Sequence, residues 1–143
     1  MINIYKLKNI KINNKNKFKK LIKIIITLEN KILYLINIIF CSNKYILYLN
    51  KKFLNKNYYT DTITFNYNFI NNIYGDIFIS VDQININKKL WKVNFSIETK
   101  RVVIHSLLHL LGYNDNNKKN IKNMIYKENH YLKLLKYIKF KYE

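Results

Sequence analysis

The sequence predicts a single α+β domain, in which one small mixed β-sheet of about four strands is packed with helices. The chain has 143 residues with no linker or internal repeat, so residues 1–143 are expected to share one hydrophobic core. Short β-prone runs and longer segments of helical apolar spacing follow one another in the order βαβαββαα. The seventh element is a helix that is apolar nearly all round, so it is expected near the centre of the domain.

The first half of the chain predicts two strands, each followed by a helix. Residues 2–7 alternate apolar and polar side chains as a half-buried strand does, and residues 33–40 form the short β-prone apolar run of a buried one. A helix is expected between them, over about residues 16–30. Ser42 can accept a hydrogen bond from a helix N-terminus, so a second helix is expected from there to about Leu54.

The second half predicts two strands and then two helices. Residues 62–67 alternate as a strand, and residues 77–81 form another. Ser96 is expected to cap the next helix, with Thr99 where a complete capping box has Glu or Gln. A last amphipathic helix is expected over about residues 118–138.

The run His-Ser-Leu-Leu-His-Leu-Leu-Gly-Tyr-Asn-Asp at residues 105–115 has the spacing of a metal site. His105 and His109 are four residues apart on a helix, so their imidazoles lie one turn apart on the same face. Gly112 allows the backbone to leave the helix through a left-handed conformation, and this turn can bring Asp115 back over that face. Two imidazoles and a carboxylate, with a fourth position open to water, form the ligand set of a catalytic zinc site. The sequence therefore predicts one Zn²⁺ held by His105, His109 and Asp115, which are also the predicted catalytic residues.

A structural role for the two histidines is the alternative. Apolar residues surround them, and a buried helix can carry a satisfied core histidine. The positions of the rare residues favour the metal site. Two of the three histidines fall at ligand spacing, and one of the two glycines falls where the turn toward Asp115 requires it.

The residue after His105 narrows the chemistry. A zinc protease of the His-Glu-x-x-His type has a glutamate there as general base. This chain has Ser106 instead, and its helix holds no acid after Glu98, which disfavours a peptidase. A phosphodiester can be cleaved by metal-activated water while the metal also neutralises charge on the phosphate.

The net charge of +18 is compatible with an RNA substrate, because lysines bind phosphates without sequence preference. The composition weakens this argument. The chain has no Ala, no Pro and a single Arg, Arg101, beside many Lys, Asn, Ile and Tyr, as expected from an A/T-rich genome. The lysine-rich residues 15–20 are equally well explained as the solvated face of a helix.

A cytoplasmic protein without a membrane partner is expected. The single Cys41 excludes an internal disulfide and fits a reducing compartment. Residues 1–16 lack the apolar core of a signal peptide. The longest apolar stretch, residues 32–41, is about half of the roughly 20 residues that span a bilayer.

The motif and its flanking segments resemble the bacterial YbeY family, the metal-dependent endoribonucleases of ribosomal RNA maturation. The family signature is His-Gly-x-Leu-His-Leu-x-Gly-Tyr-Asp-His, and residues 105–115 are similar to it in register. Two upstream family segments, Leu-Asn-x-x-Tyr-Arg and Thr-Asp-Val-Leu-Ser-Phe, resemble residues 49–54 and 60–65. The family's Gly-Asp-Ile strand and Met-x-x-x-Glu pattern resemble residues 75–77 and 124–128, so the similarity runs in order over about residues 40–130.

This resemblance implies an activity and partners. It implies an endoribonuclease with one zinc ion held by three side chains, and ribosomal RNA as the substrate. It also implies a role in ribosome biogenesis, with small-subunit ribosomal proteins as candidate partners. The metal-activated water would hydrolyse or transesterify the phosphodiester. The alternative is a degenerate member of the family that binds RNA or ribosome components without cleaving them.

The third metal ligand departs from the family pattern. Asp115 stands where the family has a histidine. A carboxylate is a competent zinc ligand at about 2.0–2.2 Å, but its charge makes the activated water less acidic than a third imidazole would. His130 is the less favoured candidate for this position, because it lies several helical residues farther along the chain.

Two other positions also depart from the family. Leu54 stands where the family has an arginine expected to contact the substrate phosphate, and leucine offers no guanidinium fork. Lys51, Lys52 or Lys56 are the candidates to compensate as point charges. Ser106 replaces a glycine, and it is expected to hinder close helix packing or the approach of the substrate backbone.

Polar residues in the other family-like segments have two interpretations. Asp61 and Asp76 either orient a ligand or line the cleft, or else cap a strand or turn. Capping is preferred for Asp61, and both roles stay open for Asp76. Tyr113 is expected to pack under the turn, and Glu128 to pair within its own helix near Lys127 rather than act as a catalytic acid.

Overall fold

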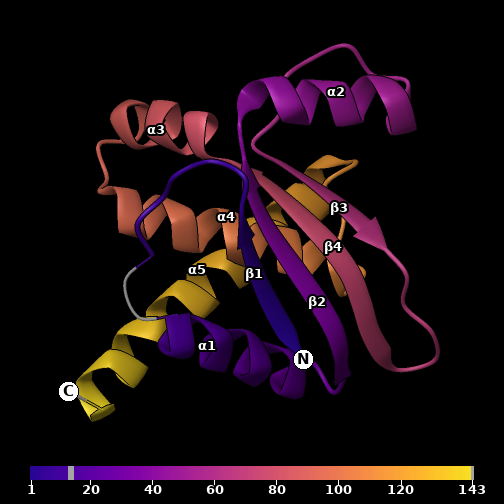
Figure 1. The fold of residues 1–143 in the computed structure, drawn as a ribbon. Helices are drawn as coiled ribbons and strands as arrows, with labels where there is room; N and C mark the ends of the chain where they lie inside the picture. Colours follow the sequence, from indigo (N-terminus) through magenta and orange to yellow (C-terminus); the bar gives the residue numbers. More distant parts are fainter. Residues whose placement is uncertain (13–14, 143) are drawn as a thin grey trace.

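The computed structural model describes residues 1–12 and 15–142, with side chains as far as Lys136, and it confirms the α+β architecture (Figure 1). The strands of the described chain are β1 (Ile2–Lys6), β2 (Ile32–Cys41), β3 (Thr62–Asn66) and β4 (Asn72–Ser80). Its helices are α1 (Lys15–Leu28), α2 (Asn43–Leu54), α3 (Val81–Leu90), α4 (Phe95–Leu110) and α5 (Lys118–Tyr142).

The four strands form one mixed sheet in the order β1-β2-β4-β3. The first three of these run parallel, and β3 lies antiparallel to β4 at the edge. Alternate residues of each strand point to opposite faces. On β4, Gly75, Ile77 and Ile79 face the helices, whereas Tyr74 and Phe78 face the other way.

The two faces of the sheet are covered unequally (Figure 1). Residues of α1, α4 and α5 pack with the strands into one large core on the first face. On the second face α2 packs at one end only, where Ile46 and Leu49 meet Ile63 in a small core of their own. No helix among the described residues covers the rest of the second face (Figure 1).

Helix α4 is central, as predicted from its apolar sequence. It packs against α3 and α5 on its flanks and against β3 and β4 beneath. Its buried positions run almost without interruption from Val102 to Leu110. The few polar positions of α4 that reach the surface therefore line the edge of the core, where β3 ends the sheet.

Helix α3 is the one element of the described chain that the sequence analysis missed. The residues predicted to end a strand at Val81 begin this helix instead, because the Ser80 hydroxyl accepts a hydrogen bond from the Gln83 amide (3.1 Å). Only a few α3 side chains are buried, so the helix has little apolar periodicity. The start of α4 also differs from the prediction. Asn94, and not Ser96, is its N-cap, accepting from the Ile97 amide (2.8 Å).

Gly75 marks a tight contact between the sheet and α4. A Cβ atom at this position would lie 2.6 Å from the Phe65 carbonyl oxygen and 2.6 Å from Leu110 Cδ1. The carbonyl belongs to the neighbouring strand and cannot rotate away. Gly75→Ala is therefore expected to destabilise the fold by about 1–3 kcal/mol, as overpacked cores do.

Urea unfolding followed by circular dichroism measures this effect. Asn72→Ala, near the start of the same strand, is the matched control and is expected to change stability much less. An unchanged midpoint for Gly75→Ala would mean that β3 and α4 separate easily at this contact.

No helix in the part of the chain that the structure describes is both long and apolar enough to cross a membrane.

Candidate metal centre

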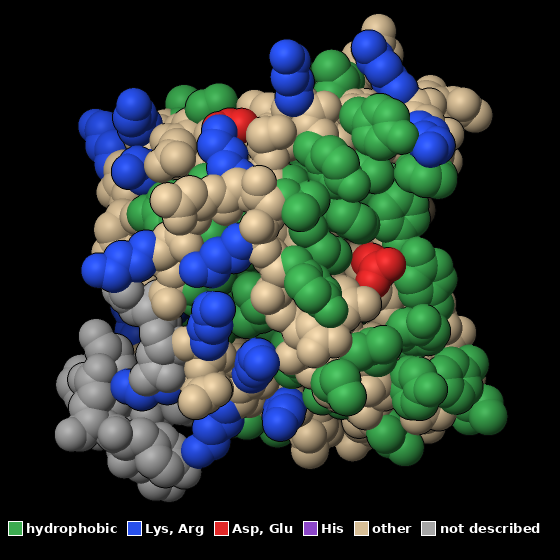
Figure 2. Space-filling model, in the orientation of Figure 1, with side chains coloured by type: hydrophobic (Ala, Val, Ile, Leu, Met, Phe, Trp, Pro, Cys, Tyr) green, Lys and Arg blue, Asp and Glu red, His purple; other side chains and the backbone are tan. Residues whose placement is uncertain are grey.

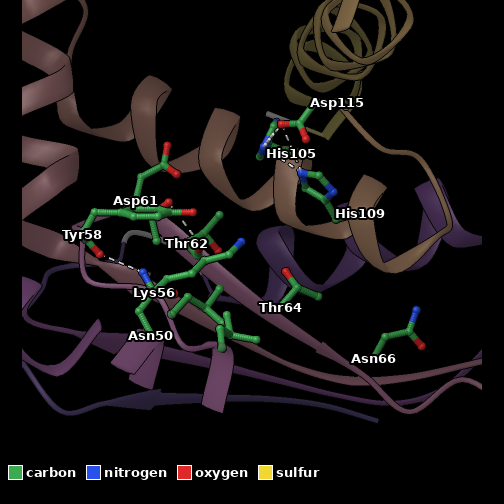
Figure 3. A pocket seen from close by; sticks show the side chains of 13 residues that line it. Asn50, Lys56, Tyr58, Asp61, Thr62, Thr64, Asn66, His105, His109 and Asp115 are labelled. Carbon is green, nitrogen blue, oxygen red and sulfur yellow. Dashed lines mark hydrogen bonds and ion pairs between the residues drawn. The ribbon is translucent and has the colours of Figure 1, made fainter. Parts of the chain in front are cut away.

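A cavity of about 490 Å³ opens at the β3 edge of the sheet. The C-terminal end of α2, strand β3, helix α4 and the turn after α4 all contribute to its lining. Figure 3 shows His105, His109 and Asp115 pointing toward one another at one end of it, and Asn50, Lys56 and Tyr58 at the other. The structure thus brings together all three residues that the sequence predicted as metal ligands.

The three candidate ligand atoms form a compact triangle. His105 Nε2 lies 3.1 Å from His109 Nε2, and the Asp115 Oδ2 atom lies 3.9 Å and 3.7 Å from these two nitrogens. Ligand atoms bound at about 2.0–2.2 Å around a tetrahedral zinc ion lie roughly 3.3 Å apart. The observed triangle therefore fits a zinc ion with only a small inward movement of Asp115, whose side chain is 51% exposed.

The turn that brings Asp115 into place is built by Gly112, as the sequence predicted. Its φ of 105° is one that residues with a side chain rarely adopt. The Gly112 and Tyr113 amides donate to the His109 and Leu108 carbonyls (3.1 and 3.0 Å), which is the hydrogen-bond pattern of a Schellman motif. The Asn68 side chain bonds the Leu110 carbonyl (2.7 Å) and so fixes the same helix end to the β3–β4 loop.

Glu128 of α5 holds the first histidine from behind. Its buried carboxylate makes a short hydrogen bond with His105 Nδ1. A proton on Nδ1 shared with this carboxylate leaves Nε2 with its lone pair directed at the cavity. The prediction that Glu128 pairs within its own helix is therefore wrong, because its partners lie on α4 and not on α5.

The two histidines differ in their electrostatic surroundings. Burial alone would lower the pKa of His105, but the hydrogen bond and negative charge of Glu128, with the charge of Asp61, outweigh it and raise this pKa. Burial and the positive charge of His105 lower the pKa of His109. His109 is thus held as the neutral imidazole, which is the form that binds metal.

Arg101 connects the acids around the site. It makes a close bidentate contact with Glu98 (2.7 Å from Nη2) and also reaches Asp61 (3.4 Å) and Glu128 (3.9 Å). Asp61 lines the cavity and pairs with this guanidinium, so the preferred capping role for Asp61 gives way to the cleft-lining alternative. The sequence analysis gave Arg101 no role. The available signal was that the single arginine of the chain lies one helical turn before His105.

Leu54 and Ser106, which depart from the family pattern, lie in different surroundings. Leu54 lines the cavity, and Lys56 lines it too, with its ammonium 5.8 Å from the centre of the Tyr58 ring. Lys56 is thus the candidate to compensate for the missing arginine. Ser106 is fully buried and bonds Thr62 of β3 (2.7 Å) and the Val102 carbonyl (2.7 Å). It lies against the sheet, outside the cavity lining, and α4 still packs closely on β3.

The remaining polar candidates lie away from the ligand triangle. Asp76 points to the second face of the sheet, where Asn37 and Tyr67 donate to its oxygens (2.9 and 3.3 Å). His130 is exposed and stacks on Tyr126, so it does not join the cluster. As predicted, Tyr113 packs against the core beneath the turn, and it also donates to Glu29 of the α1–β2 turn (2.7 Å).

Comparison with known proteins identifies similar sequences. The sequence profile described as "Endoribonuclease YbeY" matches residues 3–136. Proteins named Endoribonuclease YbeY from Karelsulcia muelleri (strain GWSS) and Chlorobaculum tepidum are 49% and 43% identical over 87 and 88 residues. These matches cover 61% and 62% of this chain, and 62% and 64% of the two relatives, which is less than two thirds of their length. A longer match, 35% identity over 119 residues, covers 83% of this chain and 80% of the Endoribonuclease YbeY of Chlorobium phaeovibrioides.

The fold is also found among solved structures. The solution structure of a Thermotoga maritima protein superposes with a TM-score of 0.64 at 27% sequence identity. The match covers 94% of this chain and 89% of that protein. The arrangement of sheet and helices described above is therefore shared with an experimentally determined structure.

Proposed function

The chain belongs to the endoribonuclease YbeY family, and from this premise we propose that it is a zinc-dependent endoribonuclease that acts in the maturation of ribosomal RNA. The observation that carries the proposal is the triangle of His105, His109 and Asp115 at the end of an open cavity. Small-subunit ribosomal proteins are the proposed partners and the cytoplasm is the proposed location.

The donor set suits zinc. His105, His109 and Asp115 would hold the ion and leave one tetrahedral position free, which is typical of catalytic rather than structural zinc. A zinc ion bound there supplies a Lewis acid that activates water and offsets negative charge on the phosphate. The carboxylate of Glu128 orients His105 for this role through Nδ1, an arrangement common among histidine ligands of metals.

The rest of the cavity suits a phosphodiester. Lys56 supplies a positive charge at the end opposite the ligand triangle (Figure 3). The Thr62 and Thr64 side chains from β3 lie between the two ends. The Thr62 hydroxyl bonds Ser106 and the Phe78 carbonyl, so Thr64 is the residue that offers its hydroxyl to the substrate. We propose that Lys56 binds a phosphate of the substrate and so replaces, as a point charge, the arginine that Leu54 does not provide.

A non-catalytic RNA-binding role is the second candidate, and Leu54 is the observation that favours it. Leucine at this point of the cavity removes the bidentate phosphate contact that the family arginine would make. The same degenerate protein would have no need for an ordered ligand triangle with a buried carboxylate behind it. That triangle favours the catalytic proposal.

Cleavage of ribosomal RNA by the zinc-loaded protein tests the proposal, and Lys56 is the informative position. Lys56→Met is expected to lower the cleavage rate about tenfold to a hundredfold, the worth of one charge-assisted hydrogen bond, while zinc content stays unchanged. Lys56→Arg is expected to keep or raise the rate, because the guanidinium binds phosphate at least as well.

Lys89→Met on the exposed side of α3 is the matched control for lost charge. Equal rates for Lys56→Met and Lys89→Met would refute the role of Lys56. No cleavage by any zinc-loaded form, with RNA binding retained, would establish the non-catalytic alternative.

A further inference from the structure

Exposed aromatic rings gather on the second face of the sheet, the face turned away from α1, α4 and α5 (Figure 2). One cluster consists of Tyr34, Tyr67, Phe69 and Tyr74, with ring centroids 5.2–5.4 Å apart along the chain of contacts. A second cluster consists of Tyr45, Tyr48, Phe53, Phe65 and Phe78, with centroids 5.8–6.1 Å apart. We call the two clusters together the aromatic face.

Five rings of the aromatic face are exposed to solvent over about half of their surface. Tyr34, Tyr48 and Phe53 are 53%, 49% and 56% exposed, and Tyr67 and Phe69 are 45% and 44% exposed. Large exposed apolar patches that polar groups border are typical of binding surfaces. We therefore expect a partner molecule to bind the aromatic face.

A row of polar side chains crosses the sheet between the two clusters. Asn3 donates to Asn37 (3.0 Å), Asn37 donates to Asp76 (2.9 Å), and the Tyr67 hydroxyl donates to Asp76 (3.3 Å). The row thus joins β1, β2 and β4 to Tyr67, the residue that follows β3, and it stays partly exposed. Amide and carboxylate groups are the partners that the edges of nucleic-acid bases hydrogen-bond.

The charges indicate where a nucleic acid would place its phosphates. The Lys52 ammonium lies 5.5 Å from the centre of the Tyr48 ring and 5.4 Å from that of Phe53, and Lys44 and Lys51 are exposed on the same helix. Figure 2 shows lysines at this end of the patch and a lone acidic side chain within it. Phosphates are attracted to the lysine-bearing end, whereas Asp76 repels them and leaves the middle to bases. A second copy of the chain is a poor occupant, because two molecules of charge +18 repel each other.

From these observations we propose that the aromatic face binds single-stranded RNA, with bases stacked on its rings. Sequence-tolerant binding of single strands combines such stacking platforms with nearby positive charge. The proposal rests on the proposed function, in which RNA is the substrate, and adds a second binding surface to the metal cavity.

The aromatic face and the metal cavity share one border. Thr62 and Thr64 of β3 line the cavity, and Phe65 of the same strand belongs to the aromatic face. At the end of α2, Leu54 lines the cavity while its neighbour Phe53 packs on Phe65. A single strand of RNA that leaves the cavity across β3 or the end of α2 therefore meets the rings directly.

Fluorescence anisotropy of a labelled, unstructured 12-nucleotide RNA tests the proposal. The measurement is made with EDTA present, so that binding is separated from cleavage. Tyr34→Ala and Tyr48→Ala, one from each cluster, are each expected to weaken binding about fivefold to a hundredfold, as the loss of one stacked base does. Tyr126→Ala on α5 is the matched control, because that ring is 68% exposed and lies outside the aromatic face. Lys52→Met is expected to reduce the salt dependence of binding, whereas Tyr34→Ala, which contacts no lysine of α2, is expected to leave it unchanged.

Three outcomes would overturn the proposal. Tyr34→Ala and Tyr48→Ala could bind RNA as tightly as Tyr126→Ala does. Sedimentation could show dimers that Tyr34→Ala dissociates without any change in RNA affinity, which would make the face a contact between copies. An acidic protein could lose affinity for the Tyr34→Ala and Tyr48→Ala variants while the affinity for RNA stays the same.

The test of RNA binding by the aromatic face does not depend on whether the protein cleaves RNA. His109→Ala, which lies in the cavity, is expected to retain the tyrosine-dependent binding. Failure of the zinc-loaded protein to cleave RNA would refute the proposed function and leave the aromatic face as an RNA-binding surface.

Discussion

His109→Ala is expected to lose both zinc and RNA cleavage while its fold persists. The purified parent protein should contain about one zinc ion per chain, since two imidazoles and a carboxylate complete a catalytic site. Two remaining ligands do not hold zinc through dialysis, so the variant should contain almost none. Its cleavage rate should fall to that of buffer. Elemental analysis of the dialysed protein and a gel assay of RNA cleavage measure the two effects.

His130→Ala is the matched control for His109→Ala. His130→Ala removes a histidine that is exposed and stacked on Tyr126, and it should keep its zinc and its activity. Stability is compared in EDTA, because bound zinc stabilises the parent by mass action and would exaggerate the loss. Stoichiometric zinc in His109→Ala would show that the metal is held elsewhere.

Two substitutions at Asp115 test the third candidate ligand by the same measurements of zinc content and RNA cleavage. Asp115→Ala should lose most of its zinc. Asp115→His restores the ligand that the family has at this position, and it should keep zinc. Because a neutral imidazole does not offset the charge of the ion as a carboxylate does, we expect faster cleavage near neutral pH with this variant. Equal zinc contents in all three proteins would remove Asp115 from the ligand set.

Glu128→Ala is expected to weaken zinc binding about tenfold to a hundredfold, although Glu128 does not belong to the ligand triangle. The carboxylate contacts Nδ1 and so orients the ring, and in the neutral imidazole it favours the tautomer with the proton on Nδ1. Without it, His105 is free to rotate and to place a proton on the nitrogen that faces the cavity. Competition with a chromophoric zinc chelator measures the affinity. Glu128→Gln keeps a hydrogen-bond acceptor, so its loss should be smaller.

The pH dependence separates this role from a purely structural one. Zinc and a proton compete for Nε2 of His105, so zinc affinity falls as the pH drops through the raised pKa of His105. In Glu128→Ala this pKa is lower and the proton competes only at a lower pH. The deficit of the variant should therefore be largest at alkaline pH and narrow as the pH falls through the raised pKa of His105. A deficit that is constant with pH would mean that Glu128 acts only through packing.

Local sequence accounts for much of the site. The four-residue spacing of His105 and His109 places their rings together on any helix, and Gly112 permits the turn that returns Asp115 to them. These relations span eleven residues and depend on backbone geometry alone. The same holds for the Ser42 cap, where the hydroxyl accepts from the Tyr45 amide (3.2 Å) as predicted. Alternation and apolar runs predicted the four strands for similar reasons.

Apolar periodicity in the sequence did not predict helix α3. Only a few of its side chains are buried, because it packs at the margin of the domain beside α4. Apolar periodicity reports burial, so a helix that buries little carries a weak signal. Its Ser80 cap was present in the sequence, but the neighbouring apolar residues matched a strand equally well.

The sequence by itself determined the grouping of His105, His109 and Asp115 and the α+β class, because both follow from interactions between residues near one another in the chain. Only the tertiary structure decided which groups surround that triangle. Glu128 reaches His105 from α5, Arg101 reaches Asp61 just before β3, and Lys56 lines the same cavity as the candidate ligands. Likewise, the rings of α2, of β2, β3 and β4 and of the β3–β4 loop form one surface only once the strands are paired. Contacts between distant segments depend on packing and register, and no local spacing of residues encodes them.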